Sequence, residues 1–200
     1  MNKASGILYL VATPIGHLGD ITFRAVEILR AVDFVICEDS RRSGMLMKHL
    51  GLQKKFRALH EQTPPEKQKS IIEELKKGTS AALISDAGTP LVSDPGFELV
   101  REAIKSGIRI ESIPGPTAFV SALILGGLPS HRFLFVGYLP QKEKARCDAL
   151  KELADFPYTL IFYESPYRLL KALKDMIDVF GNRKASVSRE LTKKFEETVR

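Results

Sequence analysis

Short apolar runs alternate with stretches of helical periodicity along the first part of the chain. The run 81–84 is uninterrupted, which is typical of a strand covered on both faces in a parallel sheet. We predict further strands at 6–12, 34–37 and 108–113, and a short one just before His60. Helical patterns follow Asp20 and cover 41–50, 64–78 and 95–107. Strands separated by helices imply right-handed crossovers and a parallel α/β sheet.

Polar residues at the helix starts predict where the helices begin. Ser40 is the expected N-cap of the second helix, and Ser93 or Asp94 that of the helix beginning at Pro95. Pro64 suits the first turn of the third helix, and Gly78 its end.

A second domain is expected after a small-residue helix at 117–126 and a linker beginning Gly127-Leu-Pro129. Its strands are predicted at 133–137, 159–163 and 184–188, and its helices at 145–154 and 166–180. Segments 185–188 and 195–199 are expected to be strands without partners, which leaves open edges. The predicted domains are therefore an N-terminal parallel-sheet α/β domain, 1–126, and a C-terminal α/β domain, 127–200.

Composition narrows the class of protein. A content of 44% hydrophobic residues in 200 allows a sizeable core, and the net charge of +6 is compatible with a polyanionic partner. Cys37 and Cys147 have neither disulfide nor metal-ligand spacing, which fits a reducing compartment. The sequence shows no membrane-spanning stretch and no signal-peptide hydrophobic region at its start, so a cytoplasmic location is expected.

Four loops rich in polar residues, glycine and proline follow predicted strands, at 13–22, 38–42, 85–90 and 114–118. Open α/β sheets bind ligands at this end of their strands. In the third loop, Asp86 offers carboxylate oxygens, Gly88 permits close backbone approach and Pro90 restricts the turn. The chain contains neither a Gly-x-Gly-x-x-Gly dinucleotide signature nor a P-loop, which disfavours phosphate-binding nucleotide enzymes.

These loops, in this order, resemble those of the ribosomal RNA small subunit methyltransferase I family, within the tetrapyrrole methylase superfamily of class III S-adenosylmethionine-dependent enzymes. The similarity also covers Gly127-Leu-Pro129 and Leu160-Ile-Phe-Tyr163-Glu164-Ser165. His17 and Ser40 depart from the family pattern, where Asn and Thr are common, but both stay polar. Members usually continue for several tens of residues further, so the second domain is expected to be incomplete, with omitted residues or a naturally short homologue as the alternatives.

The resemblance implies a tetrapyrrole methylase-like fold of two α/β domains with the cofactor, S-adenosyl-L-methionine, held between them. It also implies methylation of a cytidine ribose 2′-oxygen in small-subunit (16S) ribosomal RNA, as naked RNA or assembled subunit, by a homodimer. The cofactor-binding residues expected from it are Pro14, Gly16, Leu18, Asp86, Gly88, Thr89, Pro90, Pro116, Thr117, Ala118, Phe162 and Tyr163. The competing interpretation is that the glycines and prolines only form turns and that Asp86 caps nearby backbone.

The segment Glu38-Asp39-Ser40-Arg41-Arg42 carries the catalytic candidates Glu38, Asp39 and Arg41. Arg41 is expected to clamp an RNA phosphate, while Glu38 or Asp39 orients a ribose hydroxyl or the arginine. An ion-pair cluster that only caps the helix is the alternative. The candidates for a general base, left unranked, are Glu38, Asp39, His17, His60 and Glu164.

The basic segment before the first helix of the second domain has two open interpretations. The basic segment 141–146 is either a solvated helix start or an RNA phosphate contact. No spacing of His, Cys or carboxylates resembles a metal site, so no metal is expected. The rival functions are methylation of a tetrapyrrole carbon or a modified protein histidine, and a non-catalytic RNA-binding ribosome-assembly factor.

Overall fold

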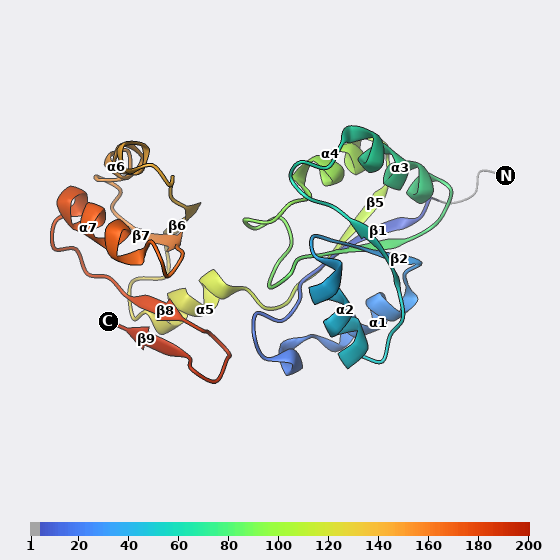
Figure 1. The fold of residues 1–200 in the computed structure, drawn as a ribbon, viewed down its shortest axis with the longest axis horizontal. Coiled ribbons are helices and arrows are strands. Elements are labelled where there is room, and N and C mark those ends of the chain that lie inside the picture. The colour runs from blue at the N-terminus through green and yellow to red at the C-terminus, as the bar shows by residue number, and fades with distance from the viewer. Residues whose placement is uncertain (1–4) are drawn as a thin grey trace. The chain divides into compact units, whose positions relative to one another are not determined.

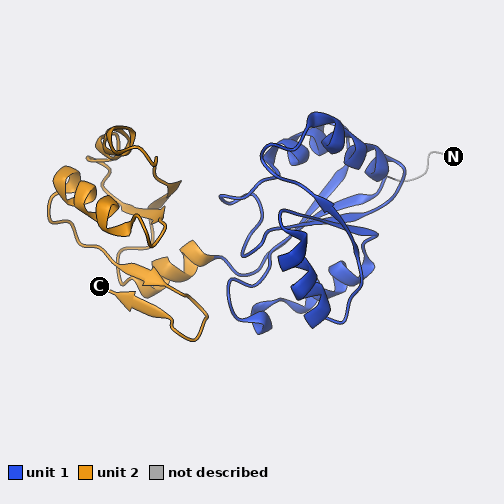
Figure 2. Cartoon of the chain, in the orientation of Figure 1, with its two compact units in different colours: residues 1–117 blue, residues 118–200 orange. Residues whose placement is uncertain are grey.

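The computed structural model describes residues 5–200, which form two compact units, 1–117 and 118–200 (Figure 2). Residues 1–4, at the start of the segment for which no signal peptide is predicted, lie outside the described part. No helix among the described residues combines the length and the apolar character needed to cross a bilayer.

The first unit contains a five-stranded, fully parallel sheet in the order β3-β2-β4-β1-β5 (Figure 1). Its strands are β1 Ile7–Val11, β2 Phe34–Cys37, β3 Lys55–Ala58, β4 Ala81–Ile84 and β5 Arg109–Ile113. The connecting helices are α1 Phe23–Ala31, α2 Ser40–His49, α3 Pro65–Lys76 and α4 Phe97–Lys105, with a short 3₁₀ helix at Leu18–Asp20. All the strands predicted for this domain are confirmed.

Each face of this sheet packs against an apolar layer. Successive strand residues point to opposite faces, so a strand can contribute to both layers. Leu8, Ile36 and Leu83 face α3 and α4, where Leu75 and Leu99 are fully buried. The opposite face packs on α1 and α2 through, among others, Val11, Val35, Ile84, Leu29 and Met47. Figure 1 shows the two helix pairs on the two sides of the sheet.

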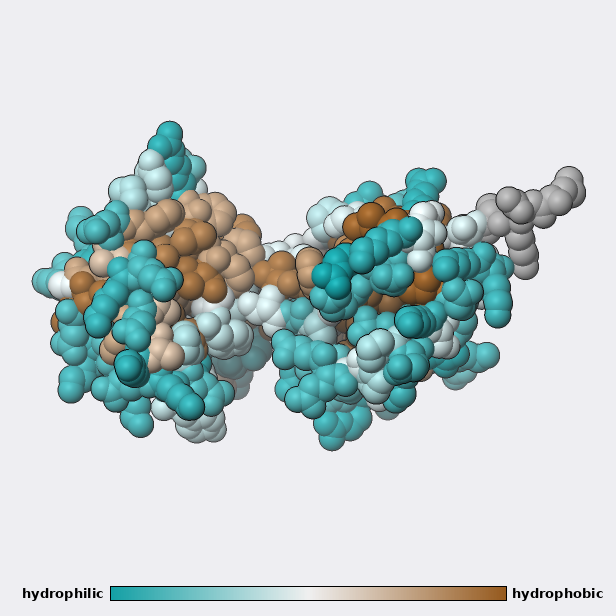
Figure 3. All heavy atoms as spheres, turned by 90° about the horizontal axis from the view of Figure 1, so that it is seen from above, coloured by the Kyte–Doolittle hydropathy of each residue, from teal (hydrophilic) through white to brown (hydrophobic). Residues whose placement is uncertain are grey.

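The second unit comprises a parallel pair of strands, an antiparallel hairpin and three helices. Its elements are α5 Ala118–Leu125, β6 Phe133–Tyr138, α6 Glu143–Lys151, β7 Thr159–Tyr163, α7 Leu169–Phe180, β8 Val187–Arg189 and β9 Glu197–Val199. β6 pairs with β7, and β8 with β9. Figure 3 shows apolar residues exposed on this unit, at the left of the view. The exposed apolar side chains of α7 include Leu170 and Ile177, which are 81% and 62% exposed.

Helix α5 contacts β7 and β8 and so lies with the second unit. The predicted boundary at 126/127 differs from the observed division by this one helix.

Three local predictions are wrong. Asp39, rather than Ser40, caps α2, because its carboxylate accepts the N–H of Arg41 at 2.8 Å. Neither Ser93 nor Asp94 caps α4, which starts after Gly96, because Leu91 and Ser93 hold left-handed conformations that turn the loop first. The terminal strands β8 and β9 are not left unpaired, because the hairpin pairs them with each other.

Candidate active site

The site lies at the carboxyl edge of the five-stranded sheet, where the chain leaves adjacent strands in opposite directions. From β1 and β2 it continues to α1 and α2 on one face, and from β4 it continues toward α4 on the other. Since β4 lies between β2 and β1, its loop diverges from both neighbouring loops. Such switch points form the ligand-binding crevices of open α/β sheets.

Backbone hydrogen bonds join the loops after β1 and β4. Thr13 and Gly88 exchange two of them, with N–O distances of 2.9 and 3.0 Å. The buried hydroxyl of Thr13 donates to the carbonyl of Ser85 at 3.0 Å, and the Ser85 hydroxyl donates to that of Gly88 at 2.8 Å. The loop that carries Asp86 is therefore fixed relative to the first loop.

The loop after β5 joins the same assembly. The hydroxyls of Thr89 and Thr117 lie 2.7 Å apart, and Thr89 also donates to the carbonyl of Pro116 at 3.3 Å. Gly88 has a φ of +87°, and a Cβ added there would lie 3.3 Å from Cγ2 of Ile15. The three loops thus contact one another through backbone groups and small hydroxyl side chains. Little side-chain bulk lies at these contacts, which suits close approach of a ligand.

Asp86 connects the loop after β4 to the one after β2. Its Oδ1 accepts the backbone N–H of Asp39 at 3.2 Å, and its Oδ2 lies 3.6 Å from Nε of Arg42. Both predicted interpretations of Asp86 therefore stay open, because the carboxylate caps backbone while remaining partly exposed.

Asp39 and Arg41 form a bidentate ion pair. Nε and Nη2 of Arg41 donate to the two carboxylate oxygens at 3.1 and 2.8 Å. These hydrogen bonds lower the pKa of Asp39 to about 2, so its carboxylate is a poor proton acceptor at neutral pH. This geometry is that of the helix-capping cluster, although the Arg41 side chain is 88% exposed and its outer edge faces solvent.

Asp94 lies near Glu38 and Asp86, although its sequence predicted only a helix cap. It is half-buried in the loop before α4, and burial, with the negative charges of Glu38 and Asp86 nearby, raises its pKa to about 6. Three carboxylates therefore lie together at the ends of β2 and β4. The signal in the sequence was its position eight residues after Asp86 in a loop rich in glycine and proline.

Cys37, at the end of β2, is a buried structural residue. Burial raises the pKa of its thiol, the nearby Ser43 hydroxyl opposes this, and the charges of Asp86 and Asp39 raise the pKa further. A buried neutral thiol is a poor nucleophile.

The first loop exposes two of its three predicted ligand residues. Pro14 is buried beneath it, while Gly16 and Leu18 are exposed. His17 caps the 3₁₀ helix, because its Nδ1 accepts the N–H of Gly19 at 3.1 Å. That nitrogen is engaged in a structural bond, which weakens His17 as a base. His60 follows β3, at the outer edge of the sheet, and its backbone N–H donates to the Thr63 hydroxyl at 2.7 Å.

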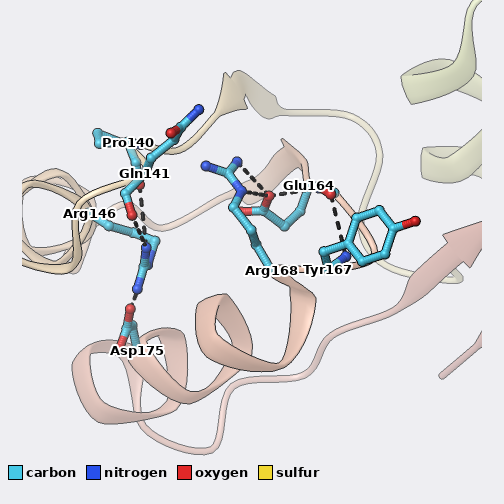
Figure 4. A network of polar contacts seen from close by, with 8 residues as sticks. Pro140, Gln141, Arg146, Glu164, Tyr167, Arg168 and Asp175 are labelled. Atoms are coloured by element: carbon cyan, nitrogen blue, oxygen red, sulfur yellow. Dashed lines mark hydrogen bonds and ion pairs between the residues drawn. The ribbon is translucent and has the colours of Figure 1, made fainter.

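In the second unit, the predicted residue Ala118 begins α5, and Phe162, Tyr163 and Glu164 lie at the carboxyl end of β7. The Tyr163 ring contacts those of Phe135 and Tyr138, with centroids 5.0 and 5.5 Å away. The next residue, Glu164, has only 7% of its side chain exposed, and its Oε1 accepts hydrogen bonds from the Ser165 N–H and from Nε of Arg168, both at 2.7 Å (Figure 4). Its Oε2 is buried without a partner among the described residues.

The structure thus gathers most of the predicted site residues of the first unit at one sheet edge, and places Ala118, Phe162 and Tyr163 in the second unit. The assignment of all these residues to a cofactor, and its contact with both units, stay predictions. Residues 5–200 contain no cluster of three or more His, Cys, Asp and Glu side chains that could hold a metal ion.

The comparisons with known proteins agree on one family. Residues 7–200 match the family model of Tetrapyrrole (Corrin/Porphyrin) Methylases. The chain is 50% identical to the ribosomal RNA small subunit methyltransferase I of Pasteurella multocida, over all of this chain and 71% of the relative. It is 51% identical to the protein of the same name from Haemophilus influenzae, over 98% of this chain and 70% of the relative.

A solved structure shows the same fold. The uroporphyrin-III-C-methyltransferase from Thermus thermophilus matches with a TM-score of 0.62 at 21% identity, over 96% of this chain and 81% of that one. The predicted family and the tetrapyrrole methylase-like α/β fold are both confirmed.

Proposed function

We propose that this chain, which belongs to the ribosomal RNA small subunit methyltransferase I family of tetrapyrrole methylases, methylates the 2′-oxygen of a cytidine ribose in small-subunit ribosomal RNA with S-adenosylmethionine. The observation that carries the proposal is about 50% identity to proteins of that name over the whole chain. The geometry adds a sheet edge whose groups suit a ligand: joined backbone loops, carboxylates and exposed arginines.

The residues present fit the proposed cofactor. A zwitterion with a sulfonium, an amine and a ribose needs hydrogen-bond acceptors and close backbone approach rather than a phosphate cradle. Asp86 supplies a partly exposed carboxylate, and the contacts of Thr13 with Gly88 and of Thr89 with Thr117 hold the three loops together beside it. Gly16, Leu18, Thr89, Pro90 and Pro116 would complete this wall, with Pro14 supporting it from below. From the second unit we assign Ala118, Phe162 and Tyr163 to the same ligand.

When bound, the cofactor supplies an electrophilic methyl group, and the protein must align the ribose hydroxyl and accept its proton. We propose Glu38 and Asp94 as the proton acceptors, because the other candidates are otherwise placed. Asp39 is paired with Arg41, the Nδ1 of His17 accepts the Gly19 N–H and Glu164 is paired with Arg168. His60 follows β3, at the outer edge of the sheet. A carboxylate whose pKa is about 6, as for Asp94, is still ionised at neutral pH yet binds a proton more readily than an ordinary aspartate. Arg41 presents its exposed guanidinium to an RNA phosphate.

The family also supports the wider proposals. They are a homodimer, a cytoplasmic location and action on ribosomal RNA or an assembled subunit, to be tested by solution mass, fractionation and choice of substrate. The net charge of +6 suits the RNA partner, which is a polyanion.

The test is cofactor binding and methyl transfer by an Asp86→Ala variant. Loss of a charge-assisted hydrogen bond should weaken S-adenosylmethionine binding by roughly 10-fold or more, since such bonds contribute about 1.5–3 kcal/mol. Calorimetry measures the affinity, and transfer of labelled methyl to naked 16S RNA and to assembled small subunits measures the activity.

Glu73→Ala is the matched control, because Glu73 is an exposed carboxylate on α3 that forms an ion pair with Lys76. Equal affinities for the Asp86 variant and wild type would remove Asp86 from the site. RNA binding without cofactor binding would favour an assembly factor, and methyl transfer to a tetrapyrrole but not to RNA would favour the rival enzyme.

A further inference from the structure

Two arginines flank Tyr158 at the amino ends of β6 and β7. The strands are parallel, and their register places Phe133 beside Thr159, so the residues just before them, Arg132 and Tyr158, are neighbours. The hydroxyl of Thr159 donates to the carbonyl of Pro129 at 2.6 Å and fixes the two strand starts together.

Both guanidiniums are held in place by this edge. That of Arg132 lies 5.1 Å from the centroid of the Tyr158 ring and donates to the tyrosine hydroxyl. That of Arg183 donates to the carbonyls of Phe156 and Tyr158 at 3.1 and 2.6 Å, and lies 5.7 Å from the Phe180 ring. Two positive charges are therefore ordered against aromatic rings and backbone before any partner arrives.

Neither charge is neutralised by a carboxylate within the part of the chain that the structure describes. The first unit provides the contrast, because Arg57 and Arg101 also lie over aromatic rings, at 5.6 and 5.7 Å. Those two arginines are paired with Glu74 and Glu98. An arginine that lies over an aromatic ring can thus also have a carboxylate partner. The ring contacts therefore do not explain why Arg132 and Arg183 have none among the described residues.

An oligoanion is the partner that this arrangement fits. A guanidinium presents five N–H donors in a planar fork that matches phosphate oxygens, and the contacts at this edge use only some of them. Lys184, beside Arg183, is also exposed and adds a third positive charge. Ordered donors lose little conformational entropy when they bind.

We propose that Arg132, Phe156, Tyr158 and Arg183, here called the Tyr158 surface, bind the phosphate backbone of the RNA. The inference rests on the proposed function and names a contact outside the predicted reaction site. The surface lies at the opposite end of β7 from Phe162 and Tyr163, a separation of about 15 Å at roughly 3.3 Å per residue. The RNA phosphates that this surface binds therefore belong to nucleotides that flank the methylated nucleotide.

The test is RNA binding by the full chain with Arg132→Gln and Arg183→Gln combined. The probe is naked 16S RNA, with affinity measured over a series of salt concentrations. Removal of two phosphate contacts should weaken binding roughly 10-fold at moderate salt and reduce the slope of log affinity against log salt by about 1 to 2. The KM for RNA should rise with kcat nearly unchanged, and S-adenosylmethionine affinity should match that of wild type.

Arg57→Gln combined with Arg101→Gln is the control, because it removes the same net charge from arginines that already have carboxylate partners. This control should keep the wild-type salt slope. Should loss of the Arg183 carbonyl contacts unfold the double variant, Arg132→Gln alone carries the test, with about a threefold loss expected and a slope change of about 1.

The surface and the proposed function fail in different ways. An unchanged affinity and salt slope in a folded variant, or the same loss in the control, would overturn the RNA surface while leaving wild-type methyl transfer intact. Wild type that transfers no methyl to RNA would overturn the function, whereas a selective loss of RNA affinity would still support the surface.

Discussion

At the scale of single residues, Asp94 is held where its charged form is unfavourable. It lies in the segment where Leu91 and Ser93 have φ values of 69° and 62°, a backbone conformation that residues other than glycine rarely adopt. Strained backbone and a partly buried carboxylate both reduce stability, so the fold tolerates them through the packing around the loop.

Replacing Asp94 by Asn should therefore stabilise the protein at neutral pH. The native pKa of about 6 exceeds the ordinary 3.8, so the folded state binds more protons between these values and wild-type stability falls as pH rises through them. The shift of about two units sets an upper limit near 3 kcal/mol, which partial exposure reduces to roughly 1 to 2 kcal/mol.

Urea unfolding at pH 4 and pH 7.5 measures this difference. The Asn variant should lose the part of the pH dependence that Asp94 causes, while the control Asp178→Asn, at an exposed position of α7, keeps it. Identical pH dependence in wild type and the Asp94 variant would contradict the assignment.

The roles of Asp39 and Asp94 could not be predicted from the local sequence. Propensity ranks Ser and Asp as equally good N-caps, so only the backbone could decide between Ser40 and Asp39. The loop at Asp86 was identified because its glycine, proline and carboxylate are local features. The environment of Asp94 depends on Glu38, which is distant in sequence and lies nearby only through the pairing of β2 with β4.

At the scale of elements, a buried ion pair joins α6, α7 and the loop before α6. The guanidinium of Arg146 donates to Oδ2 of Asp175 at 2.6 Å and to the carbonyl of Gln141 at 2.9 Å (Figure 4). Both side chains are at least nine-tenths buried. The predicted basic segment 141–146 is thus divided, because Arg146 points into the unit while Lys142 and Lys144 stay exposed.

Asp175→Ala should destabilise the protein by about 3 to 5 kcal/mol, because it leaves the Arg146 charge buried and unpaired. The double variant that combines Arg146→Met with Asp175→Leu replaces the pair by apolar side chains and should cost much less. Denaturant unfolding of the two variants gives the comparison, with Asp178→Ala expected to change stability by under about 0.5 kcal/mol. Equal losses for the single and double variants would show that packing rather than charge is responsible.

Element positions followed from sequence where the apolar pattern was strong. The strands at 34–37, 81–84 and 159–163 match the observed ones, because each is an apolar segment bounded by turn residues. The strands predicted at 184–188 and 195–199 overlap β8 and β9, but their pairing as a hairpin did not follow from sequence. That pairing depends on a turn with Glu190 and Thr192 at positive φ.

At the scale of the whole molecule, the two units differ in how their strands are organised into sheets. The first has a five-stranded sheet covered on both faces by helices and buried cores, whereas the second divides its strands between two pairs. Sequence predicted two domains and a parallel sheet, but not the strand order, because the pairing of β4 with both β1 and β2 is a long-range choice that no local signal encodes.

A fragment of residues 1–117 should fold by itself into the five-stranded unit. Its compact contacts and two apolar cores lie within that range, so the fragment keeps the packing that stabilises the sheet. Circular dichroism should show one cooperative thermal transition, and proton exchange should be slowest in β1 and β4. A fragment that shows no cooperative transition would mean that the second unit contributes to the stability of the first.

The central place of β4 also bears on how the protein is made. During synthesis β1 and β2 emerge early, yet they are not neighbours in the sheet, and each gains its common partner only when Ala81 to Ile84 leave the ribosome. At ~5–20 residues per second, the nascent chain spends several seconds with apolar strands that have no native pairing between them. Insertion of β4 then joins β1 to β2 and places the Asp86 loop beside the loops that follow both strands, before β5 is added next to β1. Synthesis from the N-terminus therefore cannot join the two parts of the sheet without also forming the centre of the candidate site.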